Sequence, residues 1–171
     1  MSSEPKKYDV VVTRVFDAPV EQVWRAWTDP EYVRQWWGPQ GFTCPVARMD
    51  FREGGTSLVC MRAPQEYGGQ DTYSTWTYTK IVPHERIEYV FNFSDKDGHK
   101  LTPAQMGLEA GIPEDGRHVI TFKNLGDPST RLRTGRTEMT MTEHGYTTDQ
   151  AHDISKAGLE QCLDKMAESL K

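Results

Sequence analysis

Side chains that could do chemistry are scattered along this 171-residue chain instead of forming known motifs. The five histidines show no HxH or HExxH spacing, so we expect no metal site and interpret them as exposed or singly hydrogen-bonded residues. No serine lies in a GxSxG elbow, and no Gly-rich phosphate loop occurs, so we predict no catalytic set and no cofactor. Cys44, Cys60 and Cys162 are interpreted as small buried hydrophobic side chains.

One charged pair could lie in a cavity, because Asp50 and Arg52 flank the aromatic Phe51. In a strand, neighbours of an inward residue point to the opposite face of the sheet. This parity favours an ion pair on the outer face over a polar pair inside.

A stronger signal comes from aromatic and methionine side chains on the expected strands. These side chains adapt to varied apolar shapes, and tyrosine adds a hydroxyl group. They fit either a solid core or the wall of a cavity for a small hydrophobic molecule, and the residues alone leave both open. Together with two positions of the last helix, the candidate ligand-binding residues are Trp36, Trp37, Phe51, Met61, Trp76, Tyr78, Tyr89, Phe91, Met139, Met141, Gly158 and Cys162.

The stretch from Asp17 to Pro39 holds four of the five tryptophans and predicts two short helices. Pro19 suits a first helical turn, with Asp17 or Ala18 as the cap. Asp29-Pro30 ends the first helix and starts the second by the same logic. Each helix has one apolar stripe, formed by Val20, Val23, Trp24 and Trp27, and then by Tyr32, Val33, Trp36 and Trp37.

Alternating and β-branched segments predict an antiparallel meander. The clearest alternation places Ile87, Tyr89, Phe91 and Phe93 on one face. In the second strand, Thr43, Ala47, Met49 and Phe51 are expected on the dry face. The predicted strands are residues 8–16, 43–51, 56–62, 72–82, 86–93, 117–125 and 134–143.

The segment from Ser94 to Gly116 interrupts this pattern. Thr102-Pro103 predicts one or two helical turns, because a cap followed by proline starts a helix. A connection of this length is typical of a lid or of a surface excursion. We expect Met106, Leu108 and Ile112 to close the open end of the sheet, with Trp36 and Trp37 on the opposite rim.

Residues 147–171 form a predicted helix capped by Thr148 or Asp149. Its broad apolar face needs a sheet to lie on. We expect Gly158 to mark the closest approach to that sheet. The apolar positions are Ala151, Ile154, Gly158, Leu159, Cys162, Leu163, Met166 and Leu170. The fold class is α+β, with a curved antiparallel sheet of six to seven strands wrapped around this helix.

The length and charge favour a single domain over residues 1–171, with residues 1–7 disordered. The net charge of −5 is dispersed, so no nucleic-acid partner is expected. No apolar run reaches membrane-spanning length, and the N-terminus lacks the apolar core of a signal peptide, which predicts a cytoplasmic protein.

The order of several motifs resembles the activator-of-heat-shock-protein-ATPase-homologue-like family of the START-like, or SRPBCC, superfamily. The opening is the most specific part: DAPVEQVWRAWTDPE followed by WWGP. The likeness continues at residues 41–43, 50–55, 78–86 and 137–145 and in the last helix around Gly158. The resemblance implies a helix-grip fold like that of birch-pollen allergens, with a cavity for a ligand. Similar sequences often carry glycine at the position of Trp76, so this indole is expected to fill part of the cavity.

Three functions follow as alternatives. The favoured one is a binding module with a cavity for a small apolar or amphipathic ligand, present as monomer or homodimer. The others are an aromatase/cyclase-like enzyme, known in the superfamily, and a co-chaperone-like interaction protein, which the family name suggests. The lack of a recognisable acid–base set disfavours the enzyme, although a fold alone never fixes a function.

Overall fold

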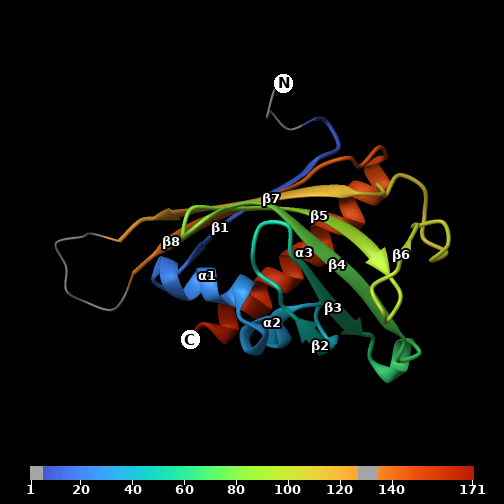
Figure 1. The fold of residues 1–171 in the computed structure, drawn as a ribbon, viewed down its shortest axis with the longest axis horizontal. Coiled ribbons are helices and arrows are strands. Elements are labelled where there is room, and N and C mark those ends of the chain that lie inside the picture. Colours follow the sequence, from blue (N-terminus) through green and yellow to red (C-terminus); the bar gives the residue numbers. More distant parts are fainter. Residues whose placement is uncertain (1–5, 127–134) are drawn as a thin grey trace.

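The computed structural model describes residues 6–126 and 135–171, in which a long helix lies against one face of a curled sheet (Figure 1). Two short helices cover the sheet near the end of the long one. The helices are α1 (Val20–Thr28), α2 (Pro30–Trp36) and α3 (Asp149–Ser169), with a 3-10 turn η1 at Gln65–Tyr67. The strands are β1 (Val10–Phe16), β2 (Thr43–Arg48), β3 (Thr56–Arg62), β4 (Asp71–Val82), β5 (Arg86–Ser94), β6 (Lys100–Leu101), β7 (Gly116–Asn124) and β8 (Thr137–Glu143).

The strands form one antiparallel sheet in the order β1-β8-β7-β5-β4-β3-β2, and the short β6 pairs with β5 outside this path. This confirms the predicted helix-grip fold. The register shifts between Thr43 and Val46 in β2 and between Tyr78 and Lys80 in β4. Such bulges bend and twist a strand, so they help the sheet curl around α3.

Helix α3 begins where predicted, because the Thr148 hydroxyl accepts a hydrogen bond from the Ala151 amide at 3.1 Å. Its buried side carries Ala151, Leu159, Cys162, Leu163 and Met166. Two expectations for this helix were wrong. Ile154 is 54% exposed, and a Cβ added at Gly158 would meet only Pro39, at 3.9 Å. The other apolar positions of the predicted face are buried, and Gly158 faces Pro39 in the loop after α2 instead of the sheet.

The tryptophan side chains of α1 and α2 pack into the interior of the sheet. Asp29 caps α2 as predicted, accepting a hydrogen bond from the Glu31 amide at 3.0 Å. The predicted cap of α1 was wrong, because Pro19 itself is the N-cap residue and no side chain caps this helix. Trp27 and Trp36 meet edge to face with ring centroids 4.6 Å apart.

Several smaller expectations need correction. Strand β2 ends at Arg48, and Thr43 is exposed instead of facing the dry side. The Asp50–Arg52 ion pair, at 2.9 Å, therefore lies in an exposed loop after the strand. Lys7 and Tyr8 form a turn, which is closed by a hydrogen bond from the Asp9 amide to the Lys6 carbonyl, so residues 6 and 7 are ordered. Residues 1–5, and position 134 at the expected start of β8, lie outside the described residues.

Candidate functional site

A cavity of about 170 Å³ lies between the sheet and α3 and is partly open to solvent. Strands β3, β5, β7 and β8, helix α3 and three loops contribute to its wall. The lining residues are mostly apolar, and the polar ones gather from β7, β8 and the start of α3. They are Trp37, Pro39, Met61, Phe91, Phe93, Ile112, Pro113, Gly116, His118, Met141, Glu143, Tyr146, Ser155, Gly158, Leu159 and Cys162.

Half of the candidate residues from the sequence meet at this cavity: Trp37, Met61, Phe91, Met141, Gly158 and Cys162. The other half pack in the core beside it. Trp36 is fully buried and donates its indole N–H to the Ala26 carbonyl at 2.7 Å. Met139 lies with its Sδ 3.1 Å from the Trp27 indole nitrogen. Tyr78 hydrogen-bonds Ser57 at 2.8 Å, and Phe51 packs on the Tyr78 ring.

The indole of Trp76 occupies interior space next to the cavity. It is fully buried, meets Trp37 edge to face at 5.2 Å and stacks on Tyr89 at 5.1 Å. Neither Trp76 nor Tyr89 lines the cavity. The bulky residue at position 76 therefore fills volume that a glycine would leave empty.

A buried polar cluster at the cavity wall was not predicted from the sequence. Nδ1 of His118 lies 3.2 Å from the Tyr89 hydroxyl, and Nε2 lies 3.8 Å from Oε2 of Glu143. The Tyr146 hydroxyl donates to Oε1 of Glu143 at 3.4 Å. His118 and Glu143 are both more than nine-tenths buried. Four titratable side chains from β5, β7, β8 and the loop before α3 thus converge on one end of the cavity.

Burial keeps His118 neutral at neutral pH and leaves Glu143 only partly ionised there. It lowers the pKa of His118 to about 3, helped by the nearby charge of His144. It raises the pKa of Glu143 to about 7, against the hydrogen bond from Tyr146, which acts in the opposite direction. Burial also raises the pKa of the Tyr89 and Tyr146 phenols, so both keep their protons.

The alternation of side chains along β8 could have indicated that Glu143 points inward, but not that it meets His118 and Tyr146. Glu143 lies two residues beyond Met141, on the same face as Met139 and Met141. His118 shares a face of β7 with Ile120 and Phe122, and was expected to be exposed or singly bonded. Their meeting depends on the β7–β8 register, which pairs His118 directly with Glu143. This register cannot be read from either strand alone.

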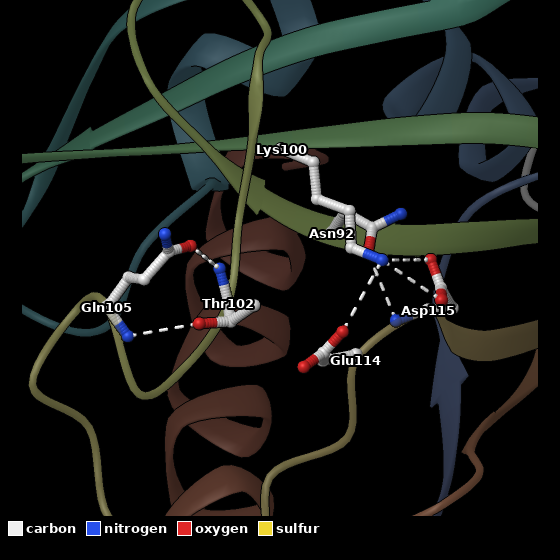
Figure 2. Close-up of polar contacts among 6 residues, drawn as sticks. All are labelled: Asn92, Lys100, Thr102, Gln105, Glu114 and Asp115. Atoms are coloured by element: carbon white, nitrogen blue, oxygen red, sulfur yellow. Dashed lines mark hydrogen bonds and ion pairs between the residues drawn. The ribbon is translucent and has the colours of Figure 1, made fainter.

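The segment between β5 and β7 forms one wall of the cavity through Ile112 and Pro113. Met106 and Leu108, expected to help close it, do not line it. The predicted helical turn is present as a single turn, in which Thr102 accepts from the Gln105 amide and Gln105 from the Thr102 amide (Figure 2). The segment is long, yet it is fastened at both ends.

Lys100 holds the two arms of this segment together, reaching Asp115 at 2.9 Å and Glu114 at 3.5 Å (Figure 2). The Asp115 amide also donates to the Asn92 side chain at 3.0 Å. On the other side, the Thr147 amide donates to the Gly111 carbonyl at 3.1 Å. Gly111 has a φ of +98° and would place a Cβ against the Thr148 side chain, so glycine is required at this joint.

The opposite rim is the loop after α2, which holds Trp37 and Pro39. The ammonium group of Lys165, on α3, donates to the carbonyls of Gly38 at 3.0 Å, Pro39 at 3.4 Å and Phe42 at 3.0 Å. Burial lowers the pKa of this amine. The side chain of Lys165 therefore fastens this rim of the cavity to α3.

The remaining groups that could react or bind a metal lie outside the cavity or are in an unreactive form. Cys162 lines the cavity, but burial raises its pKa to about 11, so it is a thiol at neutral pH. In the described part of the chain, ligand atoms of Asp95, Asp97 and His99 lie within 4.8 Å of one another on a loop. Hydrogen bonds from the Asp97 and His99 amides to Asp95 explain that arrangement. The expected absence of a metal stays a prediction.

A curled antiparallel sheet gripping a long C-terminal helix, with a cavity between them, defines the helix-grip class of SRPBCC-like domains. The model of the family described as "Activator of Hsp90 ATPase homolog 1-like protein" matches residues 17–171, and the chain belongs to this family. No curated protein matches the sequence. No helix among the described residues is long and apolar enough to cross a membrane.

Solved structures share the fold over nearly the whole chain. Protein CV1439 from Chromobacterium violaceum is 27% identical with a TM-score of 0.72, and the match covers 96% of this chain and 98% of that one. A protein from Staphylococcus epidermidis is 25% identical with a TM-score of 0.72, covering 99% and 93%. The AHSA1 protein from Silicibacter pomeroyi, at 18% identity and a TM-score of 0.67, covers 95% and 96% and supports the fold alone.

Proposed function

We propose that this protein binds a small apolar or amphipathic molecule in the cavity between its sheet and α3. The supporting observation is the cavity itself, about 170 Å³ with a largely apolar wall. Its volume is close to that of an engineered apolar cavity of ~150 Å³ that admits benzene. The expected ligand is therefore about the size of one ring with a short substituent.

The first test is native mass spectrometry of freshly purified protein, which detects a molecule that co-purifies. The second is titration with toluene, followed by quenching of tryptophan fluorescence, because Trp37 lies in the wall. Saturable binding of toluene supports the proposal. Loss of fluorescence without saturation contradicts it.

A matched pair of substitutions locates the binding. Gly158→Leu places a side chain into the cavity, where a Cβ has free space, and leucine suits a helix better than glycine. Ala157→Leu adds a leucine at an exposed position of the same helix. Toluene binding should be lost in Gly158→Leu and kept in Ala157→Leu. Equal binding by both variants would place the ligand elsewhere.

Two other functions have weaker support. The buried cluster of His118, Glu143 and Tyr146 on the cavity wall favours an aromatase/cyclase-like enzyme as the second candidate. Groups of this kind can move protons to or from a bound molecule. A co-chaperone-like role rests only on the description of the family. Stimulation of an Hsp90 ATPase by the purified protein would test it directly.

A further inference from the structure

The carboxyl group of Glu143 lies at the polar end of the cavity and is only loosely hydrogen-bonded. Its contacts are the Tyr146 hydroxyl at 3.4 Å and Nε2 of His118 at 3.8 Å. Hydrogen bonds to a carboxylate are ordinarily about 2.5–2.9 Å long. A buried acid with such long contacts still has acceptor capacity, because an ionised carboxyl group offers about four lone-pair sites.

The neighbours of Glu143 are arranged as donors toward it. The Tyr89 phenol keeps its proton and lies 3.2 Å from Nδ1 of His118. When Tyr89 donates to Nδ1, the neutral imidazole carries its own proton on Nε2, the nitrogen nearest Glu143. The Tyr146 hydroxyl also donates to Glu143. Both partners thus favour Glu143 as an acceptor.

No lysine or arginine lines the cavity in the described part of the chain. His118 is neutral, since burial lowers its pKa to about 3. The nearby Lys165 directs its ammonium group to the carbonyls of the loop after α2. Among the described residues that line the cavity, a carboxylate at Glu143 therefore has no positive partner.

We propose that the cavity takes a small primary amine whose ammonium group pairs with Glu143 and whose ring or chain fills the apolar part. This inference rests on the proposed function and names its ligand class. A cation supplies the charge that the wall lacks, and its N–H groups complete the acceptor sites of Glu143. An anion would meet the same carboxylate without a counter-charge, so it is excluded from the site.

The test uses four ligands with the same ring: toluene, benzyl alcohol, benzylamine and benzoate. Affinities are measured by calorimetry about one pH unit above the Glu143 pKa of about 7, where that carboxyl group is mostly ionised. Benzylamine should bind at least about tenfold more tightly than toluene, as expected for a hydrogen-bonded charged pair. Benzyl alcohol should fall between them, and benzoate should not bind.

Glu143→Gln keeps the shape of the side chain and removes its charge. This variant should lose the preference for benzylamine and bind toluene and benzylamine about equally. Glu138→Gln, on the same strand with its side chain on the other face, is the matched control and should behave like the wild type. Retention of toluene binding also shows that the Glu143 variant is folded.

The outcomes separate the two proposals. If toluene binds and benzylamine shows no preference, or if the preference survives in Glu143→Gln, the amine is wrong and the cavity proposal stands. If none of the four ligands binds the wild type, both proposals fail. Preferred binding of benzoate would overturn the charge argument directly.

Discussion

The indole ring of Trp76 stacks on the phenol ring of Tyr89, with centroids 5.1 Å apart and 18° between the planes. On its other side Trp76 meets Trp37, which lines the cavity. Tyr89 in turn lies against His118, which also lines the cavity. This stacked pair is therefore the boundary between the filled part of the sheet interior and the space left for a ligand.

Replacing Trp76 should enlarge the cavity. Trp76→Ala removes a fully buried indole and should cost about 3–5 kcal/mol in the free energy of unfolding. It should also allow a two-ring probe such as naphthalene to bind, which the wild type excludes. Denaturant unfolding and fluorescence titration measure the two effects. A variant that stays as stable as the wild type would show that the indole is not in the core.

The tryptophan of α1 should matter for stability but not for binding. Trp24 is buried and contacts the rings of Phe51, His84 and Phe122, away from the cavity. Trp24→Ala should cost about 3–5 kcal/mol, as large-to-small core changes do. In contrast to Trp76→Ala, it should not admit naphthalene. Unchanged thermal unfolding would mean that the apolar stripe of α1 is misplaced.

Glu143 should make stability fall as pH rises. Its pKa is about 7 in the folded protein, raised by burial from an ordinary value of 4.5. The stability that comes from the protonated form is complete below the lower value and lost as pH rises through the higher one. Glu143→Gln removes this loss. Relative to the wild type, the variant should gain up to roughly 3 kcal/mol between about pH 5 and pH 8.

The pKa shift of His118 makes stability depend on pH in the opposite direction, which the control must take into account. Its pKa is lowered from 6.5 to about 3, so stability is lost as pH falls through that range. Both proteins contain His118, so its own pH dependence is present in each, and the coupling between the two side chains at 3.8 Å is part of the measured difference. The other groups around Glu143 are Tyr89, Tyr146, Ser155 and Cys162, and they stay neutral here. A stability difference that does not change with pH would contradict a buried Glu143.

Lys165 should stabilise the cavity rim. Lys165→Met removes the donor from three carbonyl groups of the loop after α2. Loss of these hydrogen bonds should cost about 1–3 kcal/mol and speed hydrogen exchange in residues 38–42. Lys156→Met, at an exposed position of the same helix, is the control. If both variants unfold alike, the rim does not depend on Lys165.

Lys100 should control access more than stability. Its contacts with Glu114 and Asp115 are exposed ion pairs, which contribute little to the free energy of unfolding. Lys100→Met should still loosen the segment that carries Ile112, so toluene should enter and leave faster at nearly unchanged affinity. Stopped-flow fluorescence measures both rates. Lys96→Met, in the same segment, should leave them unchanged, and equal rates in all three proteins would refute the role of this segment.

The fold could be predicted because its signals are local and periodic. Alternation along β5 and the Asp29-Pro30 junction between the first two helices each specify structure from a few neighbouring residues. The errors arose where the exact position of a single residue decides which face of the helix or strand it lies on. Ile154 and Ala151 are both apolar and three residues apart, so the pattern could not fix which of them faces the sheet.

The candidate site was less predictable, because it depends on contacts between distant strands. Tyr78 and Met139 have side chains typical of a cavity wall, but both pack in the core. The Tyr78 hydroxyl hydrogen-bonds Ser57, and the Met139 sulfur accepts from the Trp27 indole. His118 carries no motif, and its role appears only when β7 pairs with β8. Side-chain type predicted the wall of the cavity, whereas its polar end required the register of the sheet.

The pairing of β1 with β8 has a consequence for how the chain folds during synthesis. Thr13 lies opposite Thr140, 127 positions later in the chain. At about 5–20 residues per second, a ribosome needs roughly 6–25 s to make the intervening segment. For that time β1 has no partner strand, and Val10, Val12 and Phe16 have no core in which to bury. Until β8 is made, the unpaired first strand is thus open to aggregation or to capture by a chaperone.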